Sequence, residues 1–71
     1  MFTETGCYQV PITEDTKIHE TLGKIKRKND GRWEWWRWSS QFHKNWKGSA
    51  QGVTLTKEGA EAQILAGWYN R

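Results

Sequence analysis

The sequence predicts an α+β fold, in which an antiparallel meander of three or four strands packs on one C-terminal helix. Two observations support it. The pair Asp30-Gly31 between two strand-like segments is a strong hairpin signal, because a tight turn needs a positive φ that Gly adopts without strain. Near the C-terminus Ala60, Ile64 and Trp68 recur every four residues, as on the apolar side of a helix.

The length of 71 residues is enough for a single domain with a small core. We therefore expect one domain over residues 1–71, with its sheet within 7–55 and its helix at 57–68. Six tryptophans supply much of the apolar area that so short a chain can bury.

The first expected strand covers residues 7–12, where Tyr8 and Val10 alternate with other residues. Pro11 has no amide hydrogen to donate, so this strand is expected at an edge of the sheet. Residues 1–6, which precede it, are expected to fray.

Residues 22–38 form the expected hairpin. If Asp-Gly occupies the two central turn positions, Ile25 lies opposite Trp36 and shares the helix-facing side of the sheet with Trp36 and Trp38. The other face then carries cations that alternate with aromatic rings: Lys24, Lys26, Lys28, Trp33, Trp35 and Arg37.

A three-residue loop with a bulge is the alternative turn. It moves Trp33 and Trp35 to the side of Ile25 and leaves Trp36 and Trp38 beside the lysines. Both registers place two tryptophans among cations on one face, so an exposed aromatic pair is expected in either case.

Residues 39–48 contain many turn formers and are expected to form a long loop, with Phe42 or Trp46 folded back over the sheet edge. The last expected strand is 49–55, in which Gly52 indicates a bulge or the close approach of another group.

Thr56 is the expected N-cap of the helix, because its hydroxyl can accept a hydrogen bond from a free amide of the first turn. Glu58 and Glu61 favour the same assignment, since acidic side chains stabilise the positive end of the helix dipole.

Positive charge is concentrated in the hairpin. The whole chain has a net charge of +3, but residues 24–37 carry six cations against two acidic residues, Asp30 and Glu34. Such a local basic surface indicates an anionic partner.

Groups for catalysis are few. His19 and His43 are far apart in sequence, and the single cysteine, Cys7, permits no disulfide within the chain and no paired metal motif. We expect no enzyme activity, no metal site and no cofactor. The lone cysteine, with no signal peptide and no long apolar run, favours a cytoplasmic protein away from membranes.

Alternating cations and aromatic rings favour a nucleic-acid-binding module, with DNA preferred over RNA. Lys and Arg neutralise phosphates, rings stack on bases, and a two-stranded ribbon can enter the major groove. The candidate nucleic-acid-binding residues are Lys24, Lys26, Lys28, Arg32, Trp33, Trp35 and Arg37. The same rings could anchor a protein partner or a homodimer, which leaves a protein-interaction factor as the alternative.

The last fifty residues also resemble a known family. Gly31-Arg32-Trp33, followed by the segment 52–60 with its Thr and Glu, is similar to the three-strand-plus-helix domain of plant ethylene-response-factor DNA-binding proteins and of phage integrase arm-binding domains. That resemblance implies that the sheet lies in the major groove, with contacts from Arg32, Trp33, Trp35 and Arg37.

Small Trp-rich proteins of phages and prophages show a similar C-terminal pattern, and some of them inhibit host proteins. This second resemblance implies a phage-encoded inhibitor as one form of the interaction factor.

Overall fold

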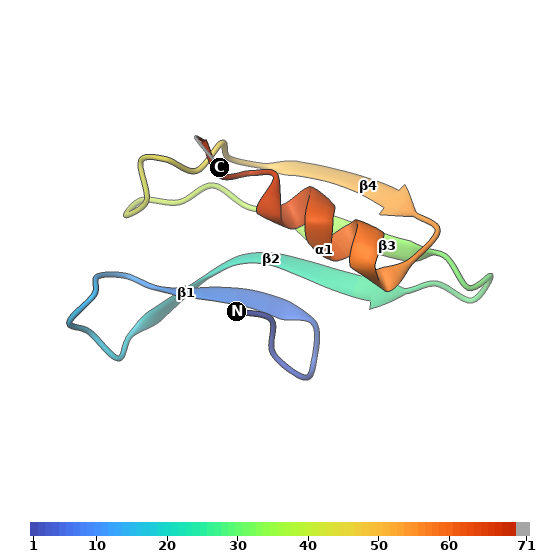
Figure 1. The fold of residues 1–71 in the computed structure, drawn as a ribbon, viewed down its shortest axis with the longest axis horizontal. Coiled ribbons are helices and arrows are strands. Elements are labelled where there is room, and N and C mark those ends of the chain that lie inside the picture. The colour runs from blue at the N-terminus through green and yellow to red at the C-terminus, as the bar shows by residue number, and fades with distance from the viewer. Residues whose placement is uncertain (70–71) are drawn as a thin grey trace.

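The computed structural model describes residues 1–69 and shows a four-stranded antiparallel sheet with one helix (Figure 1). Each strand pairs with its neighbours along the chain, so the sheet is a meander, and the α+β prediction is confirmed. The elements are β1 (Cys7–Pro11), β2 (His19–Arg27), β3 (Trp33–Arg37), β4 (Ala50–Thr54) and α1 (Lys57–Leu65).

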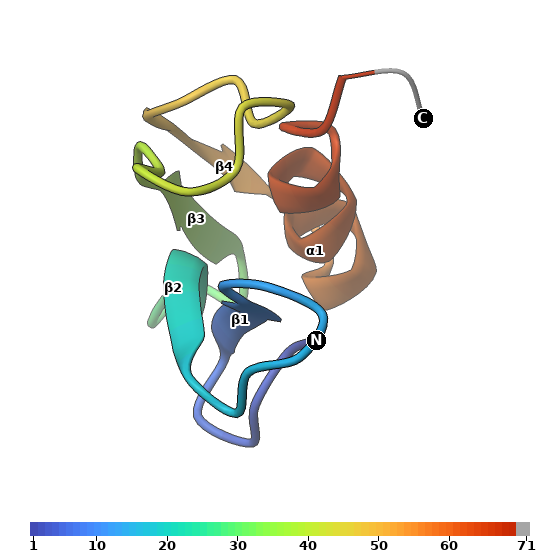
Figure 2. The ribbon, with the colours of Figure 1, turned by 90° about the vertical axis from the view of Figure 1, so that its left-hand side faces the viewer.

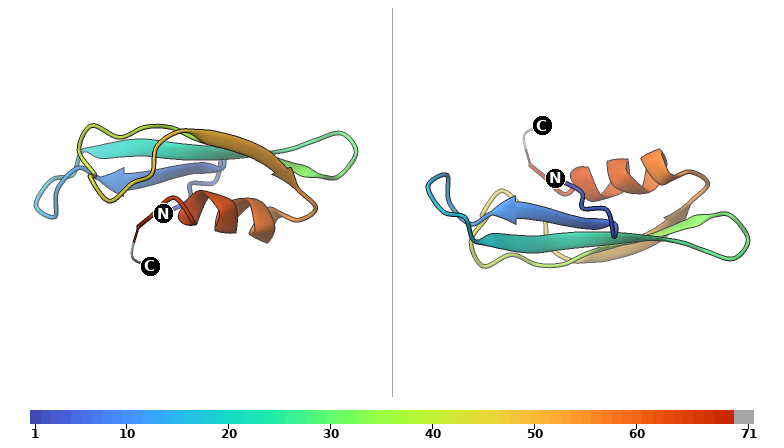
Figure 3. Two further views of the ribbon diagram at one scale, coloured as in Figure 1. Left: turned by 90° about the horizontal axis from the view of Figure 1, so that it is seen from above. Right: turned by 90° about the horizontal axis from the view of Figure 1, so that it is seen from below.

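The helix lies on one face of the sheet, so the fold has two layers (Figures 2 and 3). Ile64 of α1 is fully buried and packs in one cluster with Leu22, Ile25 and Trp35. The contact is close because Gly23 has no side chain: a Cβ there would lie 2.9 Å from Cγ2 of Ile64. The missing side chain thus lets the helix sit directly on β2.

Gly52 likewise permits close packing, in this case by the ring of Trp35. A Cβ at Gly52 would lie 2.9 Å from Nε1 and Cζ2 of Trp35, so the indole packs against the bare backbone of β4. The close approach expected at this glycine is confirmed. Trp35 is only 8% exposed as a result.

A β-bulge interrupts the pairing of β1 with β2. Tyr8 pairs with Gly23 and Gln9 with Thr21, so Leu22 is an extra residue in β2. A bulge places two consecutive residues on the same side of a sheet. This explains why Leu22 and Gly23 are both buried although they are adjacent.

The N-terminal arm, residues 1–6, is paired with β1, and the expectation of fraying is wrong. Phe2 forms a bridge with Tyr8, and their rings lie 4.9 Å apart. The Gln9 amide donates to the Met1 carbonyl at 2.8 Å, while the Met1 ammonium donates to the Gln9 carbonyl at 2.9 Å. These hydrogen bonds extend the sheet beyond β1.

The long loop after β3 is anchored by Trp46, one of its two candidate residues. Trp46 is 6% exposed, its ring lies 6.0 Å from Tyr8, and its indole N–H donates to the Trp38 carbonyl at 2.6 Å. Phe42, the other candidate, is 52% exposed.

The helix begins where expected but ends earlier. Thr56 caps it by accepting a hydrogen bond from the Gly59 amide at 3.0 Å. It ends at Leu65, so its expected extension to Trp68 is wrong. The chain turns because Trp68 packs edge-on against Trp46 at 4.8 Å and donates its indole N–H to the Tyr8 hydroxyl at 3.0 Å.

The core assignment predicts a sharp contrast between two aliphatic truncations. Ile64→Ala should lower the free energy of unfolding by about 2–5 kcal/mol, because it leaves a cavity under the sheet. Leu55→Ala, at a side chain that is 81% exposed, should change it by less than about 0.5 kcal/mol. Urea denaturation measures both, and equal losses would contradict this core.

Candidate nucleic-acid interface

The turn between β2 and β3 determines which tryptophans face the helix. The Lys28 amide donates to the Arg32 carbonyl at 2.7 Å, which leaves a loop of three residues, and Gly31 has a φ of +88°. Ile25 consequently pairs with Trp35 rather than with Trp36. The two-residue turn expected first is wrong, and the alternative three-residue loop is correct.

Three of the seven candidate residues consequently lie on the helix side of the sheet. Trp33 and Trp35 share that side with Ile25, and both pack in or against the core. The guanidinium of Arg37 lies 5.5 Å from the Trp35 ring centre and donates to the Gln63 carbonyl of α1 at 3.2 Å. The placement of Trp33, Trp35 and Arg37 on the outer side of the sheet is therefore wrong.

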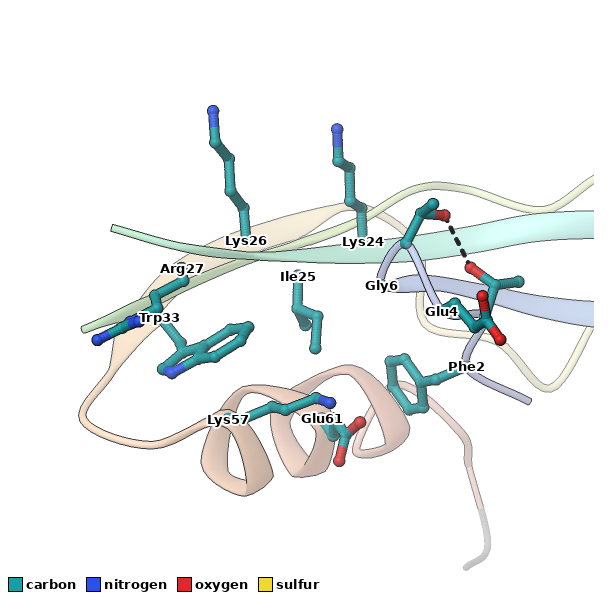
Figure 4. Close-up of a pocket in the computed structure, with 12 residues that line it drawn as sticks. Phe2, Glu4, Gly6, Lys24, Ile25, Lys26, Arg27, Trp33, Lys57 and Glu61 are labelled. Atoms are coloured by element: carbon teal, nitrogen blue, oxygen red, sulfur yellow. Dashed lines mark hydrogen bonds between the residues drawn. The ribbon is translucent and has the colours of Figure 1, made fainter. Parts of the chain in front are cut away.

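We call the side of the sheet that faces away from α1 the outer face. Strand alternation places these residues on it: Lys24, Lys26, Glu34, Trp36, Gln51 and Val53. The ammonium groups of Lys24 and Lys26 extend away from the helix, whereas Ile25 between them points toward it (Figure 4). Two of the expected basic residues thus form a row along β2.

A tryptophan lies beside this row. Trp36 is directly opposite Lys24 on the neighbouring strand and is partly exposed, and Trp38, just after β3, is 41% exposed. Lys26 is opposite Glu34. The outer face therefore combines two lysines, an aromatic ring and one carboxylate.

The tip of the hairpin carries the other two candidates, Lys28 and Arg32. Arg32 is paired with Asp30: its Nη2 lies 2.6 Å and its Nε 2.9 Å from Oδ2 of that carboxylate. The side-chain hydrogen bonds from Arg32, helped by its backbone amide, lower the pKa of Asp30 to about 2. The charge of Arg32 is balanced locally, whereas no ion pair within residues 1–69 involves Lys24, Lys26 or Lys28.

A groove lies on the opposite side of the sheet, between the N-terminal arm, the end of β2 and α1. It has a volume of about 560 Å³. Phe2, Ile25 and Trp33 line it, with Lys57 and Glu61 of the helix at its border (Figure 4). The sequence did not point to Phe2, because no local pattern distinguishes a paired N-terminal arm from a frayed one.

Residues 1–69 contain no group of three or more His, Cys, Asp or Glu side chains that could hold a metal ion. His19 lies with Nδ1 2.9 Å from the Lys17 carbonyl, and His43 packs edge-on against Trp68. No helix in this part of the chain is long and apolar enough to cross a bilayer.

Comparisons of the chain with protein-family models, with curated proteins and with solved structures find no match. The resemblance to the ethylene-response-factor and integrase domains therefore stays an expectation from the sequence.

The Asp30–Arg32 contact predicts an unusual titration. The pKa of Asp30 is depressed, so the contact is fully formed above its ordinary pKa of 3.8 and is lost as the pH falls through about 2. Carbon-13 NMR of the side-chain carboxyl should show this midpoint. Arg32→Gln should raise the midpoint toward 3.8, whereas Arg27→Gln should leave it near 2.

Proposed function

We propose that this protein is a non-enzymatic nucleic-acid-binding module whose ligand is DNA and whose binding surface is the outer face of its sheet. One observation carries the proposal: Lys24 and Lys26 extend from a sheet face that the helix does not cover, with Trp36 beside them. The proposed binding residues are three lysines of this face and of the hairpin tip, Lys24, Lys26 and Lys28, together with Trp36 and Trp38.

The lysines would supply affinity through phosphate contacts. Each ammonium that neutralises a phosphate releases a condensed counterion, so binding weakens as salt rises. Lys24 and Lys26 are available for this, since neither belongs to an ion pair in residues 1–69. Glu34 opposite Lys26 and Asp30 at the tip reduce the net positive charge, which favours moderate affinity.

The tryptophan would supply a flat apolar contact. An indole beside a lysine can pack on a base or a sugar while the neighbouring ammonium binds a phosphate. A two-stranded ribbon, such as the β2–β3 hairpin, can also enter the major groove of a duplex. The resemblance implies the same mode of docking, but Trp33, Trp35 and Arg37 lie on the helix side, so Trp36 takes their place in this proposal.

Charge reversal of the β2 row tests the phosphate contacts. The double variant Lys24→Glu/Lys26→Glu should bind a random-sequence duplex at least about tenfold more weakly, and the slope of log affinity against log salt should fall by about 2. Fluorescence anisotropy at several salt concentrations measures both quantities.

Two further variants serve as controls in this experiment. Lys57→Glu reverses a charge on the helix side and should leave the duplex affinity unchanged. Asp30→Asn should strengthen binding, because it releases Arg32 from its ion pair. An undetectable affinity of the wild-type chain, or an affinity that does not depend on salt, would refute the proposal.

A pair of tryptophan substitutions tests which face binds. Trp36→Ala should weaken duplex binding by about 1–2 kcal/mol, because the indole loses the apolar area that it would bury against sugars and base edges, without unfolding the domain. Trp33→Ala, the matched change on the helix side, should leave the affinity unchanged. Circular dichroism checks folding, and Trp35→Ala is unsuitable as a test because that ring belongs to the core.

A protein-interaction factor is the second candidate function, favoured by the groove between Phe2 and Trp33. Its floor, Ile25, is apolar, charged side chains such as Lys57 and Glu61 border it, and its volume of about 560 Å³ can hold several side chains of a partner protein. Loss of binding in Trp33→Ala but not in Trp36→Ala would support this function over the nucleic-acid proposal.

A further inference from the structure

The two outer strands of the sheet differ in how their free edges are protected. The N-terminal arm pairs with β1: the Thr3 amide donates to the Cys7 carbonyl at 2.7 Å, and Gln9 exchanges hydrogen bonds with Met1. Pro11 at the end of β1 has no amide hydrogen. The edge at β1 therefore offers few free backbone groups to another strand.

The described residues provide no such cover for the edge at β4. β4 is the last strand of the sheet, and no pairing within residues 1–69 adds a strand beyond it. Its sequence, Ala50 to Thr54, contains no charged residue and no proline, the two features that most often protect an edge. Val53 is 44% exposed and the following Leu55 81% exposed, so apolar side chains border this edge.

The hydrogen-bond pattern shows which backbone groups of β4 are free. Lys28 bonds across the hairpin to Arg32, so even-numbered residues of β3 face β2 and odd-numbered ones face β4. The β4 partners of the latter are Ala50, Gly52 and Thr54. Gln51 and Val53 therefore direct their N–H and C=O groups away from the sheet.

We propose that this edge is a self-association surface, at which β4 pairs in antiparallel fashion with β4 of a second copy of this chain. With the two-fold axis at Gly52, Gln51 of one copy lies opposite Val53 of the other. Both residues direct their backbone groups outward, so each such pair can form two hydrogen bonds. The product is a continuous eight-stranded sheet.

A second copy fits this edge better than an unrelated segment for two reasons. A two-fold contact joins one surface to itself, and a neutral strand meets no like-charge repulsion when it does so. The side chains that become neighbours, Gln51 and Val53, form an amide–aliphatic pair in both halves of the interface. Pairing of so short a strand buries less area than a standard interface of about 1,600 Å², so the dimer should be weak and dependent on concentration.

Self-association at β4 does not require nucleic-acid binding, because it uses the backbone edge of the sheet and not the row of lysines. Lys24 and Lys26 lie on β2, two strands away from β4. In the dimer the two β2 strands would lie about 24 Å apart, five strand spacings, on one outer face. A dimer would therefore present two basic rows to one ligand.

Sedimentation velocity over a wide concentration range tests the dimer. The apparent mass should rise from 8.4 kDa toward twice that value as the wild-type protein is concentrated. Val53→Pro should remain monomeric throughout, because it removes an outward amide hydrogen and no bond to β3. Val53→Thr, which keeps that hydrogen, should still dimerise.

Amide hydrogen exchange of the wild-type protein gives a second readout that needs no variant. The amides of Gln51 and Val53 should exchange fast in dilute solution and slowly at high concentration, while those of Gly52 and Thr54 are protected in both. The measurement also decides the question if Val53→Pro fails to fold. A monomer at every concentration, a dimer that leaves the Gln51 and Val53 amides fast, or a folded Val53→Pro that dimerises would overturn the proposal.

Discussion

The three-residue loop between β2 and β3 determines which side chains lie on each face of the sheet. Because side chains alternate along a strand, a register shift of one residue moves every side chain of β3 to the opposite face. Gly31, with its positive φ, permits the loop that pairs Ile25 with Trp35. The tryptophans of the core and the aromatic side chain of the outer face both depend on this one local conformation.

The core that results is built on two glycines rather than on a large set of aliphatic residues. Gly23 admits Ile64 of the helix, and Gly52 admits the ring of Trp35. A chain of this length has few positions to bury, so close contact of large side chains with bare backbone increases the apolar area removed from water. The outer face makes no such contacts with the helix, and its lysines, Lys24 and Lys26, are exposed.

A second aromatic cluster, formed by Tyr8, Trp46 and Trp68, ties distant parts of the chain together. It joins β1, the long loop and the segment after α1, and two indole N–H groups within it donate hydrogen bonds. Tryptophan suits this position because its ring fills space while its N–H satisfies a buried acceptor. This cluster accounts for two of the six tryptophans, and packing under the helix accounts for Trp33 and Trp35. Of the remaining two, Trp36 lies on the outer face and Trp38, just after β3, is 41% exposed.

The sequence by itself determined the order of the elements, the hairpin, the helix cap at Thr56 and the presence of an aromatic ring beside the lysines. Each of these follows from local patterns, namely side-chain alternation, turn chemistry and helical spacing, which act over a few residues. Only the tertiary structure decided that Trp36 and not Trp35 faces outward and that Arg37 is held against the helix. It also decided that the N-terminal arm protects one edge of the sheet and that α1 ends at Leu65. Those outcomes depend on which of two turns packs better and on contacts between residues far apart in the chain, and no local pattern encodes that comparison.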